Sequence, residues 1–486
     1  MDFIVPDFSP ALPEIVLLGL VCVVLLADLF VTDERRIVTW WLAMASLAVT
    51  LLTVLGSAPD LRTLTFSGSY VADPMGQILK IVSVGLMALV FIYSRQYLDE
   101  AGLRRGEFYT LSLFALLGIL VMISANSLLT MYLGLEMLSL ALYALVAFDR
   151  DSAVAAESAM KYFVLGAIAS GMLLFGISYI YGVTGAIEFG PLSLAIRDAG
   201  PDDVALWFGL AFLVVGIAFK FGAVPFHMWL PDVYQGARTP VTLLIGSAPK
   251  VAAFALAMRI LVDGLPELHG AWQGMLMILA VLSLGVGNVV AIAQSNIKRM
   301  LAYSTIGHVG FILLGIFTGT QAGYEAAMYY TITYVLMSAG AFGMVILLSR
   351  RGFEAEEISD FKGLNSRSPW FAAMMACFMF GMAGIPPWVG FWAKLNVISA
   401  VLDAGRFAPD GVIYTWLAIL MVVFSVIGAY YYLRVLKCVY FDAPEDSTPL
   451  TAPREMQVVL SVNALAILGL GLVPGTLLAL CASVIG

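Results

Sequence analysis

The sequence predicts an all-α polytopic membrane protein with about 14 transmembrane helices, and its composition and apolar runs both support this fold class. Of the 486 residues, 61% are hydrophobic and only 12% are charged, whereas soluble domains are roughly 45–50% apolar and about 25% charged. Apolar runs of about 20 residues recur along the chain, and each can cross a ~30 Å hydrocarbon core. The net charge of −8 comes without a basic aromatic stretch, so no nucleic-acid partner is expected.

Fourteen spans are expected, and the basic residues of the loops orient them. One set of loops holds sixteen lysines and arginines and the opposite set four: Arg62, Arg197, Arg259 and Arg406. Because cytoplasmic loops carry the basic excess, both termini are expected on the periplasmic side of a bacterial inner membrane. The N-terminus lacks a basic region and a small-residue cleavage site, so it is interpreted as the first helix. The expected spans are 11–30, 37–57, 74–94, 107–124, 127–148, 158–182, 204–224, 241–261, 270–293, 298–318, 323–349, 369–402, 411–437 and 456–482.

The other five basic residues all lie inside expected spans, and all are lysine: Lys80, Lys161, Lys220, Lys250 and Lys394. Arginine keeps its proton at any ordinary pH, whereas a desolvated lysine can release one. A proton relay needs this exchange, and a purely structural ion-pair network has no reason to avoid arginine. Lys80 lies about six residues inside its span and is expected to snorkel to the surface, so it is left out of the relay.

Two further ionisable residues lie at membrane depth. Glu136 is central in "SLLTMYLGLEMLSLALYAL", residues 127–145. A charge there costs on the order of 2.5–3.5 kcal/mol, so it normally faces a partner or a water-filled path. His308 lies mid-span and can exchange protons near neutral pH. The alternative for Glu136 is a buried carboxylate that is hydrogen-bonded or protonated. The expected proton path is Glu136, Lys161, Lys220, Lys250, His308 and Lys394.

Three more residues are accessory candidates: Glu157, His227 and Asp232. Glu157 and Lys161 are spaced i, i+4, which also suits a simple intrahelical pair. His227 lies at an expected helix break, where capping or packing is the alternative role. Asp232 and Arg238 are expected to fix the loop after that break, and His269 is interpreted as a surface residue.

Two apolar stretches, 204–236 and 369–402, are too long for one crossing, since each would measure roughly 50 Å as a helix. Prolines interrupt both near the middle: Pro225 and Pro231 in the first, Pro386 and Pro387 in the second. Interior proline breaks a helix, and broken helices at membrane depth line cavities and mark transport sites. Lys220 and Lys394 lie close to these two breaks.

Three pairs of segments indicate an internal duplication: "ESAMKYF" at 157 with "EAAMYYT" at 325, "ANSLLTMY" at 125 with "SNIKRMLA" at 295, and "GAVPFHMW" at 222 with "GIPPWVGFW" at 384. Each copy contains five expected spans, so the second copy must be inverted, as in many transporters. The predicted organisation is an N-terminal three-helix segment (1–106), a first repeat (107–265), a second, inverted repeat (266–440) and a C-terminal helix (441–486).

No metal, nucleotide or redox site is expected in this chain. Its four cysteines lie far apart, and no C-x-x-C spacing is available for zinc or an iron–sulfur cluster. No Walker-type loop or strand-linked G-x-G-x-x-G occurs. The cysteines are Cys22, Cys377, Cys438 and Cys481.

Several longer segments resemble the antiporter-like subunits in the membrane arm of respiratory complex I. They are "EMLSLALYAL", "AMKYFVLGAIASGMLLFGISYIYG", "FKFGAVPFHMWLPDVYQGARTPVTLLIGSAPKVAAFA", "IKRMLAYSTIGHVGF" and "GMAGIPPWVGFWAKLNV". The resemblance runs from about 107 to 440. "PDVYQGA", the pattern "KYFVLGA.ASG" and Lys394 favour subunit N, the counterpart of mitochondrial subunit 2, and the length fits a bacterial form. Arg238 departs from the proline expected in "YQGARTP".

This resemblance implies a proton-translocating subunit of NADH:quinone oxidoreductase. It implies that Glu136 pairs with Lys220 at the bilayer midplane, that Lys161 tunes this pair, that Lys250 and His308 continue a hydrated axis, and that Lys394 lies at the exit half-channel. NADH, FMN, iron–sulfur clusters and quinone would belong to partner subunits. Those partners would be the antiporter-like M and L types, the small K, J, A and H types and the peripheral arm, all within membrane lipid.

Two rival functions share these features. One is a subunit of a multisubunit monovalent cation/proton antiporter, which has the same fold and most of the same lysines. The other is a non-pumping structural subunit of the membrane arm, for which the intramembrane lysines would be dispensable.

Overall fold

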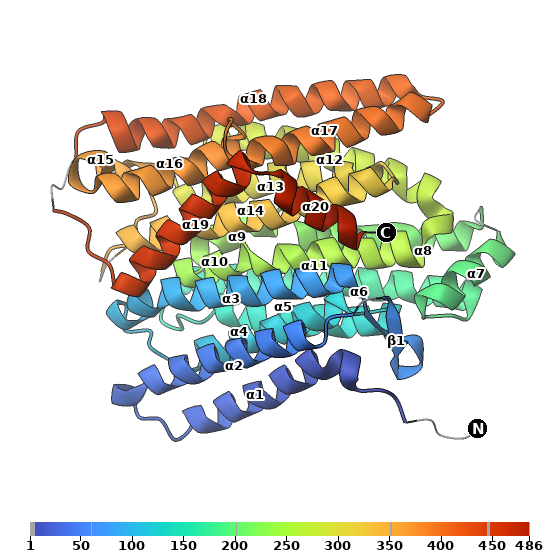
Figure 1. Ribbon diagram of the computed structural model, residues 1–486, viewed down its shortest axis with the longest axis horizontal. Coiled ribbons are helices and arrows are strands. Elements are labelled where there is room, and N and C mark those ends of the chain that lie inside the picture. The colour runs from blue at the N-terminus through green and yellow to red at the C-terminus, as the bar shows by residue number, and fades with distance from the viewer. Residues whose placement is uncertain (1–4, 60, 201, 350–351, 445–447, 486) are drawn as a thin grey trace.

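The computed structural model describes residues 5–59, 61–200, 202–349, 352–444 and 448–485. They form a bundle of long helices that lie roughly parallel and antiparallel to one another, across the view in Figure 1. Within these residues, twelve helices are long and apolar enough to cross a membrane, and three shorter apolar helices accompany them. This confirms the predicted all-α polytopic membrane fold. Arg350 and Arg351, counted above among the basic loop residues, lie outside the described part of the chain.

The described helices are α1 (Leu12–Asp28), α2 (Ile37–Gly56), α3 (Pro74–Glu100), α4 (Glu107–Ile123), α5 (Leu128–Val146), α6 (Ala153–Thr184), α7 (Phe189–Ala199), α8 (Val204–Phe221), α9 (Trp229–Gly236), α10 (Thr239–Ile245), α11 (Ala248–Ala257), α12 (His269–Ile292), α13 (Ile297–Phe317), α14 (Gln321–Leu348), α15 (Leu364–Arg367), α16 (Pro369–Ala383), α17 (Val389–Phe407), α18 (Gly411–Phe441), α19 (Arg454–Leu472) and α20 (Gly475–Val484). A π-helical turn, Met258–Gly264, extends α11, and short 3-10 turns occupy Ser9–Ala11, Asp33–Arg35, Phe66–Gly68, Pro266–Leu268 and Ile358–Phe361. An antiparallel hairpin pairs β1 (Thr63–Thr65) with β2 (Tyr70–Ala72).

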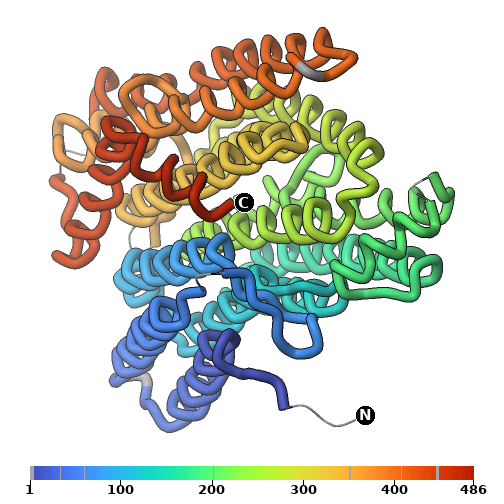
Figure 2. Tube along the Cα trace, turned by 45° about the vertical axis from the view of Figure 1, so that its right-hand side comes forward, coloured from blue at the N-terminus to red at the C-terminus, as the bar shows by residue number. Residues whose placement is uncertain are grey.

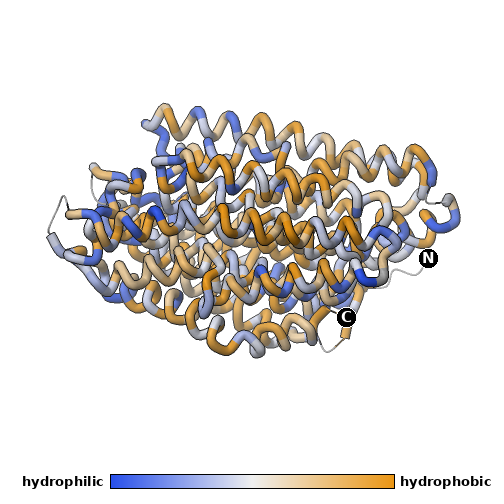
Figure 3. The backbone as a smooth tube through the Cα atoms, turned by 90° about the horizontal axis from the view of Figure 1, so that it is seen from above, coloured by the Kyte–Doolittle hydropathy of each residue, from blue (hydrophilic) through white to orange (hydrophobic). Residues whose placement is uncertain are grey.

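The bundle has two chemically different ends, which we name by their loops. The end that carries the 29–36, 147–152 and 294–296 connections, with most of the basic residues, is termed the inner end, and the opposite end, with the hairpin, is termed the outer end. Figure 3 shows hydrophilic residues gathered at both ends and hydrophobic residues between them. Helix α1 begins and α20 ends at the outer end (Figure 1), where Gln321 Nε2 donates to the Ile485 carbonyl at 2.9 Å. Both described termini of the bundle therefore lie on the same side.

The centre of the bundle is formed by the α10–α11 segment, α13 and α14. In the most apolar stretch of each of these three segments, 94% of the residues are buried, whereas in α18 only 22% are. Figure 2 shows α13 and α14 (yellow to orange) running between the N-terminal helices (blue) and the C-terminal helices (red). A side chain on these central helices is consequently shielded from lipid on every side.

Several helices begin where the sequence supplies a side-chain cap, which satisfies otherwise unpaired N–H groups of the first turn. Ser127 Oγ accepts from Thr130 N at 3.1 Å to start α5, and Asn296 Oδ1 accepts from Arg299 N at 3.0 Å to start α13. Asp73, Ser152 and Thr320 start α3, α6 and α14 in the same way. These caps fix the depth at which Glu136, on α5, and His308, on α13, lie.

The two predicted breaks are present, and two further interruptions were not predicted, one of which divides the expected span 241–261 into α10 and α11 at Gly246 and Ser247. The stretch 204–236 divides into α8 and α9, and 369–402 divides into α16 and α17. The expected last span, 456–482, is wrong as a single helix, because the chain bends at Val473 and Pro474 between α19 and α20 (Figure 1). The surface helix α7 and the outer hairpin lie in segments for which the sequence predicts neither helix nor strand.

Candidate functional site

The first break exposes the end of α8 inside the bundle. Gly222 ends this helix with φ +75°, a left-handed conformation that suits glycine. The last carbonyls of a helix lack intrahelical partners and carry partial negative charge. Lys250 Nζ, on α11, donates to the Phe221 carbonyl at 2.9 Å and lies 5.7 Å from the centroid of the Trp229 ring. A lysine from a neighbouring helix thus caps the broken end.

Lys220 lies one residue before that carbonyl and contacts a different helix. Its Nζ donates to Ser139 Oγ on α5. Lys220 and Lys250 line the same small cavity of about 10 Å³, with Tyr162 and Trp229. That volume is close to the space one water needs. Both lysines therefore border one shared space of about the size of a water.

Glu136 lies one helical turn before Ser139 on α5 and is half-buried. Its Oε1 has no hydrogen-bond partner among the described residues, and no ion pair within 4.0 Å joins it to Lys220. The expected Glu136–Lys220 pair is thus replaced in this structure by a Lys220–Ser139 hydrogen bond, with the carboxylate close by on the same helix face. Ser139 was not singled out from the sequence, although its i+3 spacing from Glu136 places it on that face.

The second break resembles the first in its backbone. Helix α16 ends at Ala383, and Gly384 has φ +81°. Lys394, on α17 beyond the break, reaches back so that its Nζ donates to the Ala383 carbonyl at 2.8 Å and to Ser425 Oγ at 2.9 Å. It is 8% exposed. The predicted proximity of a lysine to each break is confirmed.

His308 is buried at the centre of a hydroxyl cluster. Its Nδ1 lies 2.6 Å from Tyr330 Oη and its Nε2 2.9 Å from Tyr432 Oη. Tyr330 stacks on Phe311 with a centroid distance of 5.4 Å, and Lys394 Nζ lies 5.6 Å from the Phe311 centroid. Since each imidazole nitrogen has a hydroxyl partner, His308 can accept a proton on one side and donate on the other.

Lys161 lies apart from these buried groups. Its side chain is 45% exposed on α6, and its Nζ contacts Glu157 Oε1 and Asp232 Oδ2, each at 2.9 Å. Asp232 also binds Arg299 Nη1 at 2.8 Å. Burial raises the pKa of the Asp232 carboxyl, but the hydrogen bonds and positive charges of Lys161 and Arg299 lower it by more. The pKa of Asp232 is therefore lowered. The accessory candidates Glu157 and Asp232 therefore belong to a half-exposed ion-pair network near the inner end, away from the row formed by Lys220, Lys250, His308 and Lys394.

Of the two remaining histidines, His227 lies at the helix break as expected, whereas His269 is not the surface residue that the sequence predicts. His227 lies in the first break, half-buried, with its Nδ1 unpartnered among the described residues. His269, interpreted as a surface residue, is half-buried and packs edge-on against Trp272, with ring centroids 4.5 Å apart. Trp272 follows three residues later on α12, and this apolar neighbour covers the imidazole.

The prediction that Lys80 snorkels to the surface is wrong. Its side chain is 6% exposed, and its Nζ lies 2.6 Å from Glu14 Oε1 on α1 and 3.0 Å from Tyr70 Oη. A buried carboxylate from the first helix holds the ammonium inside the bundle, because leaving an ion unpaired there would cost several kcal/mol. The partner lies 66 positions away, so spacing alone did not reveal it.

Arg259 also differs from the sequence reading, which counted it as an outer-loop residue. It lies in the π-helical turn, 1% exposed, and binds Asp73 through two nitrogens at 2.6 and 2.7 Å. It still lies near the outer end. This fork-to-fork geometry is typical of a structural arginine–carboxylate pair.

Together these contacts place two pairs of protonatable groups inside the bundle, Lys220 with Lys250 at the first break and His308 with Lys394 near the second, and these four residues are termed the row. Within the described residues, no group of three or more His, Cys, Asp or Glu side chains is arranged to hold a metal ion. Such a row can pass protons between neighbours when water fills the gaps. The fold and the row define a polytopic, antiporter-like membrane protein.

The comparisons with known proteins agree with that class. A family model described as "NADH:quinone oxidoreductase/Mrp antiporter, TM" matches residues 125–428. The chain is 55% identical to NADH-quinone oxidoreductase subunit N of Thioalkalivibrio sulfidiphilus over all of both chains, and 53% identical to that of Nitrosomonas europaea over 100% of this chain and 99% of the relative. The chain belongs to the NADH-quinone oxidoreductase subunit N family.

Solved structures show the same fold. A chain of respiratory complex I from Thermus thermophilus matches with TM-score 0.81 and 30% identity, over 97% of this chain and 99% of that one. A chain of the Mrp complex from Dietzia sp. matches with TM-score 0.82 but only 20% identity, over 98% and 96%. The second match establishes a shared fold alone.

Proposed function

We propose that this chain is a proton-translocating membrane-arm subunit of NADH:quinone oxidoreductase, a translocase. It would couple quinone reduction elsewhere in the complex to proton transfer along its buried row. The observation that carries the proposal is the row itself: Lys220, Lys250, His308 and Lys394 lie within the bundle, each held by a carbonyl or hydroxyl and not by an ion pair within 4.0 Å among the described residues. A lysine held by a neutral group can release its proton without leaving an unpaired carboxylate behind.

The first step in this proposal takes place at the α8–α9 break. A proton on Lys220 would pass through the shared water-sized cavity to Lys250, whose Nζ already faces the broken end of α8. Glu136, close to Lys220 through Ser139, would favour the charged form of Lys220 when ionised. Lys161 would act on this pair only from a distance, through Asp232 and the α9 segment.

The second step links the two breaks through the tyrosine cluster. His308 would take the proton and hand it on through Tyr330, and Lys394 would hold it at the α16–α17 break before release. Hydroxyls relay a proton by accepting one while giving up their own. The two inverted five-helix repeats, 107–265 and 266–440, would place these breaks as counterparts, which the similar glycine-ended backbones support.

Membrane placement and partners follow from the same proposal. The chain would lie in a bacterial inner membrane with the basic inner end in the cytoplasm and both termini in the periplasm. NADH, FMN, iron–sulfur clusters and quinone would be held by other subunits. The M and L types, the small K, J, A and H types and the peripheral arm would be its partners, with lipid around its exposed apolar faces.

The second candidate is a cation/proton antiporter subunit, which the fold shared with the Mrp complex favours. The test uses inverted membrane vesicles of the source organism, in which NADH-driven proton uptake and NADH–quinone turnover are compared for wild type and Lys220→Met at equal content of assembled complex. Loss of uptake is expected. Unchanged uptake and turnover, or purification of the chain with small antiporter subunits in place of NADH-oxidising ones, would overturn the proposal.

A further inference from the structure

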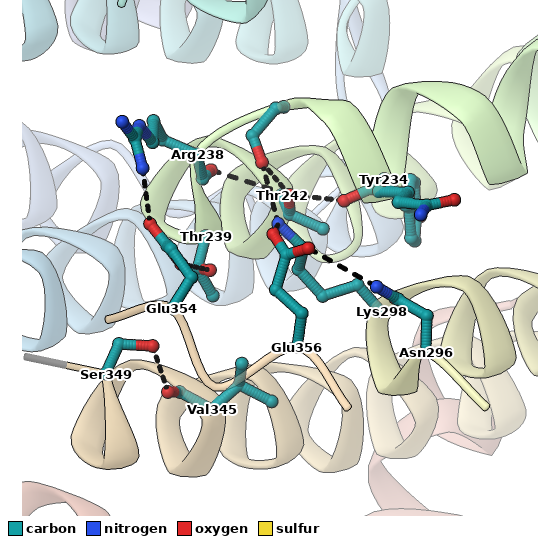
Figure 4. A network of polar contacts seen from close by, with 12 residues as sticks. Tyr234, Arg238, Thr239, Thr242, Asn296, Lys298, Val345, Ser349, Glu354 and Glu356 are labelled. Carbon is teal, nitrogen blue, oxygen red and sulfur yellow. Dashed lines mark hydrogen bonds and ion pairs between the residues drawn. The ribbon is translucent and has the colours of Figure 1, made fainter. Parts of the chain in front are cut away.

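A second group of ionisable residues lies at the inner end of the bundle, outside the row described above. Arg238, between α9 and α10, lies 2.6 Å from Asp149 Oδ2 and 3.0 Å from Glu354 Oε1. Lys298 Nζ lies 2.6 Å from Glu356 Oε1 and donates to the Ala237 carbonyl at 3.0 Å. Figure 4 shows Glu354 and Glu356 reaching from one loop toward these two cations. The five residues Asp149, Arg238, Lys298, Glu354 and Glu356 are termed the inner cluster.

The charges of the inner cluster do not balance among the described residues, since three carboxylates face two cations. Glu354 contacts one nitrogen of Arg238 at 3.0 Å, whereas Asp149 contacts two at 2.6 and 2.8 Å, so Glu354 is the less well neutralised of the two. The Thr239 hydroxyl donates to its second oxygen at 2.9 Å. Burial, followed by the negative charge of Glu356, raises the pKa of Glu354 to about 8. A protonated Glu354 would leave two carboxylates for two cations.

Of the three carboxylates in the inner cluster, Glu354 lines a cavity, together with Arg238. This cavity has a volume of about 290 Å³ and is lined by Tyr97, Glu100, Arg238, Phe353 and Glu354, at the inner end. It is large enough for several waters, each of which occupies about 30 Å³ in the liquid. The side chain of Glu354 is 19% exposed. Protons from the aqueous phase therefore have a route to this carboxylate.

On its other side, the inner cluster leads toward His308. Lys298, 1% exposed, lies in the first turn of α13, and Thr305 follows seven residues later on the same helix face. Tyr334 Oη donates to Thr305 Oγ1 at 2.7 Å, and the Tyr334 ring lies 4.8 Å from the His308 ring.

The neighbouring helix α9 packs on α13 and adds a second polar group to this route. Tyr234 on α9 is fully buried, and its hydroxyl has no hydrogen-bond partner among the described residues. Buried hydroxyls normally have a partner, so an ordered water is expected here. The backbone carbonyl of Tyr234 accepts a hydrogen bond from Thr242 Oγ1 at 2.9 Å, in the network that Figure 4 shows.

We propose that the inner cluster is the proton-loading site of this chain, with Glu354 as the group that takes the proton. The proton would move from water in the cavity to the Glu354 carboxylate. Glu354 would then release the proton to water beside Thr239 and Lys298, which restores its carboxylate. From there the proton would continue toward Tyr234, Thr305 and His308. No group is oxidised or reduced in this step. The inference rests on the proposed function and adds the point of uptake that the lysine row lacks.

The first test compares NADH-driven proton uptake in inverted vesicles for wild type, Glu354→Gln, Lys220→Met and a control, Glu107→Gln, at equal content of assembled complex. Among the described residues, Glu107 is an exposed inner-end carboxylate whose one ion pair is to Arg150. We expect Glu354→Gln to slow uptake about tenfold or more, Glu354→Asp to keep most of it, and Glu107→Gln to match wild type. If Lys220→Met stops uptake while Glu354→Gln pumps normally, this inference fails and the proposed function stands; if neither variant changes uptake, the proposed function fails.

The second test needs no variant and so does not depend on assembly. Dicyclohexylcarbodiimide attaches to protonated carboxyl groups, and peptide mass spectrometry locates the label. A carboxyl with a raised pKa holds its proton below that pKa and loses it as the pH rises above it. Label on Glu354 is expected at about pH 7 and several-fold less at about pH 9.5, and label on the exposed Glu107 is taken as the background of the reaction. An unlabelled Glu354 at neutral pH would overturn the assignment.

Discussion

The two helix breaks have similar backbones but use lysine differently. At the first, Lys250 from α11 caps the Phe221 carbonyl, and a second lysine, Lys220, is left to contact Ser139. At the second, Lys394 alone reaches back across its own break to Ala383 and Ser425. The first break therefore has two ammonium groups around one small cavity with a carboxylate nearby, whereas the second has one lysine linked to His308 only through aromatic side chains. In the proposed path, the first break would exchange a proton and the second would hold it.

Among the variants compared between the two breaks, the largest effect is expected from one that keeps a positive charge at the second break but cannot release a proton. Lys394→Arg should reduce proton uptake about a hundredfold, because a guanidinium keeps its proton. Lys80→Arg is the matched variant, since Lys80 is ion-paired to Glu14 and lies outside the row. It should pump at more than half the wild-type rate. Equal rates for both variants in the vesicle assay would remove the distinction between relay and structural lysines.

A smaller effect is expected from changing Lys250 at the first break, because Lys220 remains there to carry the proton. Lys250→Met should slow uptake about tenfold and lower the thermal stability of the assembled complex, because the buried Phe221 carbonyl would lose its donor at a cost of about 1–3 kcal/mol. Both changes can be followed on one preparation, by vesicle uptake and by thermal unfolding. Normal uptake together with lowered stability would show that Lys250 caps the end of α8 and takes no part in proton transfer.

Glu136→Gln should act more weakly again. No ion pair within 4.0 Å joins Glu136 to Lys220, so the amide would remove only a longer-range attraction, on the order of 1 kcal/mol, or about fivefold in uptake. Ser139→Ala provides the comparison, because it removes the observed Lys220 hydrogen bond and leaves the carboxylate. A hundredfold loss in Glu136→Gln would show that the direct pair forms during turnover.

The smallest effect is expected outside the row, at Lys161. This side chain is 45% exposed and paired with Glu157 and Asp232, and such half-exposed pairs contribute about 0–1 kcal/mol. Lys161→Met should change uptake twofold or less, provided that Arg299 continues to hold Asp232. A tenfold loss would mean that Lys161 contacts a partner subunit or belongs to the path after all.

Much of the fold was predictable because it depends on local sequence. Apolar length sets each span, and Pro225 and Pro386, each a few residues beyond a left-handed glycine, mark the breaks where they occur. The bend at Pro474 was missed, since the flanking apolar segment was of ordinary length for a single crossing. The hairpin was missed as well, because strands of three residues are too short to show a period of two.

The sequence by itself determined which ionisable groups lie at membrane depth and that most of them are lysine, because hydropathy and residue type need no tertiary information. Only the tertiary structure decided how they are partnered. It joined Lys80 to Glu14, Arg259 to Asp73 and Lys220 to Ser139, and turned Lys161 outward. The reason is physical: a buried charge is stabilised by whichever polar group packing brings within about 3 Å, and these partners lie on helices far apart in the chain.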